Sequence, residues 1–276
     1  METQIPYMEM ESSLTSLPFP DSKRVIFNKN PLAVVICQLR FPPVLEIVSK
    51  DPADFQNDIR GEYPLYVREE EAGLPKEVAD LLGRLPIPRA VDEVTHKFST
   101  EDAGRTISLT REFVAVTEKA YRRWEGFRQE VDRAKVALEK WYNPAFYSRL
   151  GLRYRDVIRR SEMGITEEPW ESLIKPAVIG LLGEPSIRDK IRNANCVTLV
   201  DLSDHISGGV ARIQNGLASV DGEEVYVVDV DFSTEERSPS DGVFGVLDGF
   251  NQIAGNLFRW AITPKLHAAL EPKDAD

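Results

Sequence analysis

The chain has 276 residues, of which 42% are hydrophobic and 29% charged, and this composition excludes a disordered protein. No apolar run approaches the roughly 18 residues of a membrane-spanning helix, and the first residues lack a basic stretch followed by an apolar one. We therefore expect no membrane segment, no export signal and a cytoplasmic location. The formal net charge of −11 argues against a protein coated with cations for nucleic acid.

The two cysteines, Cys37 and Cys196, each lie in an apolar, strand-like stretch. Free Cys is among the most buried residue types, and disulfides are rare in a reducing cytosol. We expect two buried free thiols.

The first half of the chain alternates strand-like and helix-like patterns. Residues 1–30 are expected to form a flexible arm. A β-branched strand follows at 31–43, bounded by prolines, and a short helix is expected after Pro52. Further predicted elements are a strand at 63–71, a helix at 74–88, a hairpin at 94–118 and a long amphipathic helix at 119–142, with Tyr121, Trp124, Phe127, Val131, Ala134, Leu138 and Trp141 as its core-facing side chains.

The second half repeats this order. A strand is expected at 146–160, and residues 161–195 are turn-rich and read as a connecting segment. Three strands follow at 196–203, 208–220 and 224–233, and then a helix at 240–262. A final helical turn is expected to start with Thr263 as N-cap and Pro264 as its first residue, and a mobile tail is expected at 271–276. Strand runs that each end in a long helix favour an α+β fold, with antiparallel sheet packed against two long amphipathic helices. The predicted organisation is a first α+β half at 31–160 and a second at 196–270.

Basic residues are concentrated in one region. Segment 105–160 holds 14 Lys and Arg and 7 Asp and Glu, a balance of +7, so the rest of the chain sums to −18 against the total of −11. In the strand at 146–160, apolar residues hold the even positions, and the two-residue period places the odd positions on the opposite face. That face is expected to carry an arginine row: Arg149, Arg153, Arg155 and Arg159.

The arginine row has two interpretations. Guanidinium groups bind carboxylates and phosphates with paired hydrogen bonds, so the row, together with Arg40 and Arg111, is a candidate surface for an acidic protein or nucleic acid. Alternatively, acids on neighbouring strands, such as Glu112 or the acidic run at 68–71, neutralise it. The sequence leaves both open.

Catalytic and metal-binding signals are sparse. Asp229 and Asp231 share one strand face and are a weak alternative site for Mg²⁺. The group Asp201, Asp204 and His205 has no second His or Cys at ligand spacing, and nothing nearby in sequence orients His96 as a base. No nucleophile elbow and no phosphate-binding glycine loop occurs. We assign no catalytic residue and no cofactor, and whether the chain is an enzyme stays open.

Four stretches together resemble a sporadically distributed bacterial protein family of about this length. They are "PLAVVICQLRFPPVLEI", "YRRWEGFRQEV", "RLGLRYRDVI" and "LFRWAITPKLHAAL", and the resemblance covers residues 31–270. One departure is Arg155-Asp156, where the family pattern has Ile-Asn. The resemblance brings no catalytic residues; the sporadic distribution implies an accessory role in a phage-defence or toxin–antitoxin-like system.

The leading hypothesis is therefore a non-catalytic bacterial binding or accessory protein that engages an acidic protein or nucleic acid through the arginine row. A metal-dependent hydrolase or nuclease built on Asp229 and Asp231 is one alternative. The other is a sensor that holds a nucleotide or other phosphate between sheet and helices. The sequence fixes neither the partner nor the oligomeric state.

Overall fold

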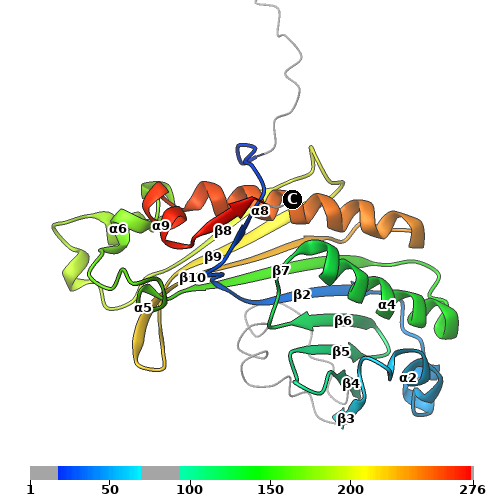
Figure 1. Cartoon of the computed structure of the whole chain (residues 1–276). Helices are drawn as coiled ribbons and strands as arrows, with labels where there is room; N and C mark the ends of the chain where they lie inside the picture. The colour runs from blue at the N-terminus through cyan, green and yellow to red at the C-terminus, as the bar shows by residue number, and fades with distance from the viewer. Residues whose placement is uncertain (1–17, 70–93, 275–276) are drawn as a thin grey trace, which may run out of the picture.

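One antiparallel sheet of nine strands is the centre of the molecule (Figure 1). The computed structural model describes residues 18–69 and 94–274, so the helix expected at 74–88 lies outside the described residues. The strand order is β3-β4-β5-β6-β2-β7-β10-β9-β8. The strands in chain order are β2 (Leu32–Arg40), β3 (Leu65–Glu69), β4 (Thr95–Ser99), β5 (Arg105–Leu109), β6 (Phe113–Glu118), β7 (Arg149–Ile158), β8 (Asn195–Asp201), β9 (Gly209–Val220) and β10 (Glu223–Thr234).

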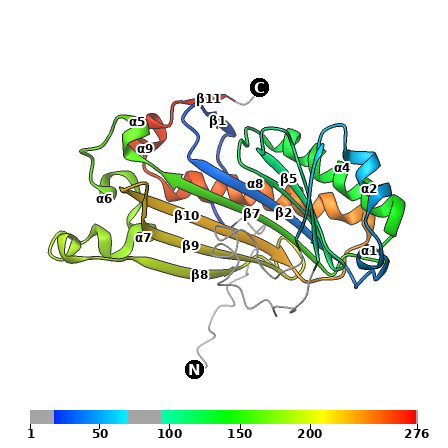
Figure 2. The same ribbon diagram turned by 90° about the horizontal axis from the view of Figure 1, so that it is seen from below.

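Two long helices, α4 (Trp124–Tyr142) and α8 (Val243–Ala261), cover the same face of this sheet, as Figure 1 shows. Their apolar stripes pack on alternate residues of the strands, and Phe250 of α8 contacts Phe232 of β10 with ring centroids 5.9 Å apart. Figure 2 shows the opposite face, which no described helix covers. The α+β prediction is confirmed.

Strands from both predicted halves belong to this one sheet. β2 from the first half and β10 from the second flank β7 on its two sides, both antiparallel to it. The second arm of the hairpin expected at 94–118, residues 105–118, is divided into β5 and β6 by a turn in which the Thr110 hydroxyl accepts hydrogen bonds from the backbone N–H groups of Glu112 and Phe113. The sheet is continuous across the two halves.

The two ends of the described chain meet in a separate two-stranded sheet. β1 (Val25–Phe27) pairs antiparallel with β11 (Pro272–Asp274), and Phe27 packs against Phe258 and His267. Phe19 is buried in the main core. Residues 18–30, assigned from the sequence to the flexible arm, thus pack against the body, and residues 272–274 of the expected mobile tail are in a strand.

Short helices make up the remaining segments. Two of them, α1 (Glu46–Ser49) and α2 (Ala53–Ile59), precede β3, and α2 packs against α4. The connecting segment holds α5 (Arg160–Met163), α6 (Trp170–Leu173), α7 (Pro176–Ile179) and the 3₁₀ turns Gly180–Gly183 and Arg188–Lys190. A further helix, α9 (Pro264–Ala269), begins as expected, with the Thr263 side chain accepting the Leu266 N–H at 3.4 Å.

Two sequence expectations about burial are wrong. Cys37 is buried but Cys196 is exposed, because it lies on β8, the strand at one edge of the sheet that the described residues form. Trp141, expected in the core, is 38% exposed, and its indole N–H donates to Asp58 of α2 at 2.7 Å. Among the described helices, none is long and apolar enough to cross a membrane.

Candidate functional site

The arginine row lies on the face of the sheet opposite α4 and α8. In β7 the even residues Leu150, Leu152 and Ile158 are fully buried towards the helices, so Arg149, Arg153 and Arg155 point to the other side. Arg159 follows just beyond the end of the strand. The predicted sidedness of these arginines in β7 agrees with the structure, but their charges have local partners.

Arg153 forms a buried ion pair. Its Nε and Nη2 donate to the two carboxylate oxygens of Asp229 on β10, both at 2.7 Å. Arg153 is 7% exposed and Asp229 8%. A two-pronged contact of this kind between buried groups uses up both charges, so it leaves little for an external anion.

Arg149 is held in a similar way. Its guanidinium donates to Asp231 at 3.0 Å and to the Gln38 side chain at 3.2 Å. The guanidinium lies across Gly151, where a Cβ would be only 2.4 Å from Nη1 of Arg149. Gly151 therefore leaves the space in which this arginine reaches its partner.

The other predicted arginines also contact acids, but nearer the surface. Arg159 pairs with Asp221 at 2.9 Å, and Arg40 and Arg111 both pair with Glu112, at 3.2 and 3.3 Å. Glu112 was expected to neutralise the row. It neutralises these two arginines instead, and the row is matched mainly by Asp229 and Asp231.

Arg155 is the exception in the row. Its cross-strand neighbour on β10 is Asp229, but Asp229 bonds to Arg153, one diagonal step away. Arg155 makes no hydrogen bond or ion pair within the described residues, and its Nε is buried without a partner.

The candidate metal ligands serve structural contacts. Both carboxylates of the Asp229 and Asp231 pair are bound to arginines. His96 is buried between the Tyr66 hydroxyl, at 2.9 Å, and the Ile47 carbonyl, at 3.2 Å. No group of three or more His, Cys, Asp or Glu side chains that could hold a metal ion occurs in the described part of the chain.

A cavity of about 590 Å³ lies on the other side of the sheet, between β7 and the helices. Its lining comes from four distant parts of the chain: residues 21–32 around β1, residues 121–124 at the start of α4, residues 154 and 156 of β7, and residues 251–259 of α8. A volume of this size suits a small organic ligand.

The carboxyl group of Asp156 forms part of the cavity floor. Asp156 is on the helix-facing side of β7, between Leu32 of β2 and Val228 of β10, and is 8% exposed. It makes no hydrogen bond or ion pair within the described residues. Burial, with the nearby Asp229 carboxylate as the second cause, raises the pKa of Asp156 to about 8.

Several other polar groups of the lining already have partners. The Tyr154 hydroxyl donates to Asn251 Oδ1 at 3.0 Å, Asn256 bonds to Asp21 and Ser22, and Asn30 bonds to backbone groups. Aromatic rings line the rest of the cavity: Phe27, Tyr121, Trp124, Tyr154 and Phe258. Asp156 thus stands out as a buried polar group that faces a mostly apolar cavity and has no partner in the described part of the chain.

Arg122 and Arg123 line the mouth of the cavity. Both are exposed, and neither makes an ion pair with a described carboxylate. They directly precede α4, whose N-terminus adds a partial positive charge. Glu125 in the first turn is already bound by Arg24, whose guanidinium lowers the pKa of that carboxyl to about 2. The mouth is therefore cationic and the floor acidic.

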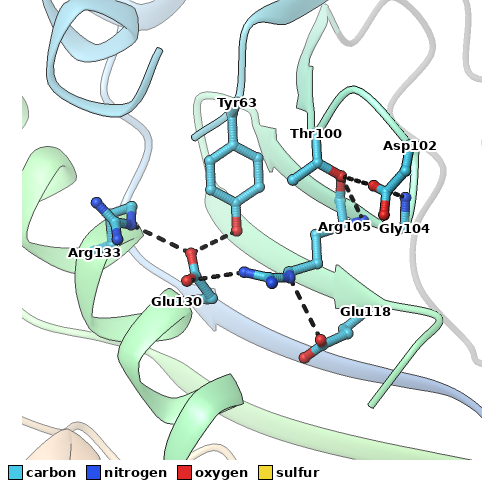
Figure 3. Close-up of polar contacts among 8 residues, drawn as sticks. All are labelled: Tyr63, Thr100, Asp102, Gly104, Arg105, Glu118, Glu130 and Arg133. Carbon is cyan, nitrogen blue, oxygen red and sulfur yellow. Dashed lines mark hydrogen bonds and ion pairs between the residues drawn. The ribbon is translucent and has the colours of Figure 1, made fainter. Parts of the chain in front are cut away.

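A neighbouring cavity of about 390 Å³ is also lined by Arg122 and Arg123. Figure 3 shows the polar network beside it, in which Arg105 of β5 bridges Glu130 of α4 and Glu118 of β6, at 2.9 and 3.4 Å. Glu130 also accepts from Tyr63 and Arg133 (Figure 3). The polar groups of this network are hydrogen-bonded to one another and connect α4 to the sheet, so we assign them a structural role.

The sequence did contain a signal for the cavity. Asp156 occupies a position that the alternation of β7 assigns to the core, where an acid is costly unless it has a partner. The other lining residues are distant in sequence, so only the fold brings them to Asp156. Comparison with known protein families and with curated proteins finds no match for this chain.

Proposed function

We propose that this chain is a non-catalytic binding protein that holds a small phosphate-bearing ligand of the nucleotide class in the cavity between β7, α4 and α8. The supporting observation is that the cavity has a different kind of group at each end. The Asp156 carboxyl lies at the floor and the guanidinium groups of Arg122 and Arg123 lie at the mouth, and none of the three has an ion-pair partner among the described residues. Aromatic rings between the two ends provide surfaces for a nucleobase, and arginines next to a helix N-terminus suit a phosphate.

A thermal-shift and calorimetric titration with AMP, GMP, CMP, UMP and ribose 5-phosphate tests this proposal. A ligand at a hundred times its Kd should add about 2.7 kcal/mol to the unfolding free energy. If none of these five compounds binds at millimolar concentration, the proposed function is wrong.

Charge reversal at the mouth gives the matching variant. We expect Arg122→Glu with Arg123→Glu to weaken nucleotide binding by at least about tenfold, because two charge-assisted contacts to the phosphate are lost. The control is Arg60→Glu with Arg192→Glu, which changes the net charge equally at two exposed arginines outside the cavity lining. Equal losses in both double variants would assign the effect to overall charge.

The open sheet face is a second candidate interface, for an acidic protein or nucleic acid. What favours it is Arg155, which has no carboxylate partner among the described residues and a buried Nε without an acceptor. A partner that docks here should lose affinity when Arg155 is changed to Glu and keep it when the exposed Arg192 is changed to Glu. If Arg155→Glu leaves binding to every anionic partner intact, this interface is excluded.

A further inference from the structure

The floor of the cavity has a specific hydrogen-bonding deficit. Tyr154 and Asn251 satisfy each other, and Asn30 and Asn256 are bonded to groups of the wall, so within the described lining Asp156 is the buried side chain that still lacks a partner. A buried polar group without a partner costs free energy. A ligand that supplies the missing hydrogen bonds recovers this free energy on binding.

The protonation state of Asp156 decides which ligand groups fit. The titratable groups nearest to it are Asp229 from β10, Tyr154 from β7 and Tyr121 ahead of α4, and α8 presents the uncharged amides of Asn251 and Gln252. The charged groups elsewhere in the lining are Asp21, Lys23 and Arg24 beside β1, Arg122 and Arg123 ahead of α4, and Arg259 of α8. Among the described residues no cation pairs with the Asp156 carboxylate, and Asp229 repels it. Near neutral pH the group is therefore a carboxylic acid, with one O–H donor and one carbonyl acceptor side by side.

We infer that Asp156 reads the edge of a nucleobase in which an exocyclic amine stands next to an unprotonated ring nitrogen, as in adenine and cytosine. The acid O–H donates to the ring nitrogen, and the acid carbonyl accepts from the amine. This inference rests on the proposed function, since it identifies the base of the nucleotide that the cavity holds. Guanine presents two adjacent N–H donors instead, which match an ionised carboxylate with two acceptors.

The inference makes base selectivity depend on pH. Below about pH 7, AMP and CMP should bind at least about tenfold more tightly than GMP, which is the discrimination expected of one two-point contact. As Asp156 ionises near pH 8, the preference for AMP over GMP should shrink. The phosphate contacts at Arg122 and Arg123 are common to all four nucleotides, so their contribution cancels in the ratio.

Variants at Asp156 provide the test, by calorimetry with AMP and GMP at about pH 6.5 and about pH 8.5. Asp156→Asn keeps one donor and one acceptor, so it should retain the AMP preference and lose its pH dependence. Asp156→Ala removes both groups and should abolish the preference. The wild-type pH comparison needs no variant, so the test stands even if Asp156→Ala does not fold.

The outcomes separate the two proposals. If AMP and GMP bind the wild type equally at about pH 6.5, the assignment of Asp156 as the base-reading residue is wrong, although the chain is still a nucleotide-binding protein. If neither nucleotide nor ribose 5-phosphate binds at either pH, the proposed function itself is wrong. A preference for AMP that survives in Asp156→Ala would place base reading elsewhere in the cavity.

Discussion

At the scale of single residues, the two faces of β7 handle charge in opposite ways. Arg153 on the open face is buried with Asp229 as its partner, at two contacts of 2.7 Å from Nε and Nη2, and its Nη1 has no partner among the described residues. Asp156 on the helix-facing side is equally buried and has no partner among the described residues. A buried ionisable group of the first kind has its charge compensated within the fold, and one of the second kind marks a site at which a ligand can add an interaction.

The raised pKa of Asp156 makes the unfolding free energy depend on pH. The folded state keeps a proton up to about pH 8 that the unfolded chain releases near pH 4, so the unfolding free energy should fall as pH rises between these values. Asp156→Asn removes this contribution. We expect the variant to gain stability relative to the wild type with rising pH, by at most about 1.4 kcal/mol per pH unit. Urea unfolding at several pH values measures this.

Asp204→Asn, an exposed change of the same chemistry, serves as its control. The wild type and Asp204→Asn should show the same pH slope. A slope that is unchanged in Asp156→Asn would mean that Asp156 titrates in its ordinary range.

The buried Arg153–Asp229 pair predicts that removing one partner lowers the unfolding free energy more than removing both. Asp229→Ala leaves a buried guanidinium without its partner, so it should cost about 3–5 kcal/mol of unfolding free energy. The double variant Arg153→Met with Asp229→Leu removes both charges and should recover most of this loss. Equilibrium urea unfolding of the two variants and of the control Asp204→Ala provides the comparison. If Asp229→Ala and the double variant lose the same unfolding free energy, the loss does not come from burying the Arg153 guanidinium without its partner.

At the scale of elements, the small sheet of β1 and β11 forms part of the cavity wall. Val25, Ile26 and Phe27 of β1 line the cavity, and β11 holds β1 in place through antiparallel pairing. The ion pairs Lys23–Asp274 and Lys29–Glu271 are largely exposed and contribute little. The position of the wall thus depends mainly on backbone pairing with the C-terminal strand.

Removing residues 271–276 should therefore loosen the wall without unfolding the core. We expect faster amide hydrogen exchange at β1 and weaker AMP binding in the truncated chain, because β1 loses its neighbouring strand. Hydrogen exchange with mass spectrometry and calorimetry measure the two effects. Lys29→Ala with Asp274→Ala is the matched control, which removes both ion pairs and keeps the strand. Wild-type exchange at β1 in the truncated chain would contradict this role.

At the scale of the whole molecule, one sheet joins the two sequence halves. β7 lies between β2 and β10, and the core runs without interruption beneath α4 and α8. Segments with a shared core and no separate interface unfold together. The similar order of elements in the two halves therefore does not by itself imply two independent folding units.

We expect a single cooperative unfolding transition for residues 31–160 and 196–270. Far-UV circular dichroism and the fluorescence of Trp124 and Trp260, each kept as a sole tryptophan in turn, should give the same urea midpoint. Tyr or Phe at the other tryptophan positions keeps the volume change small. Two distinct midpoints would show that the halves fold separately despite the shared sheet.

Local patterns predicted most elements of this fold but not how they assemble. The alternation in β7 placed Arg149, Arg153 and Arg155 on one face, and Thr263-Pro264 predicted the start of α9. Strand order is a non-local property, so the sequence did not show that β10 supplies Asp229 and Asp231 as neighbours of the row, or that β8 is an edge that exposes Cys196. The cavity depends on contacts over more than a hundred residues, which no local spacing encodes.

The diagonal offset between β7 and β10 limits what the open face can hold. Because Asp229 bonds to Arg153 and Asp231 to Arg149, Arg155 has no acid left on the facing strand. A nucleic acid that binds this face would then contact essentially one available arginine of the strand and release counterions only there. Its affinity there should change with ionic strength by a logarithmic slope of only about 1, whereas a fully available set of four cations would give a slope of about 3 to 4.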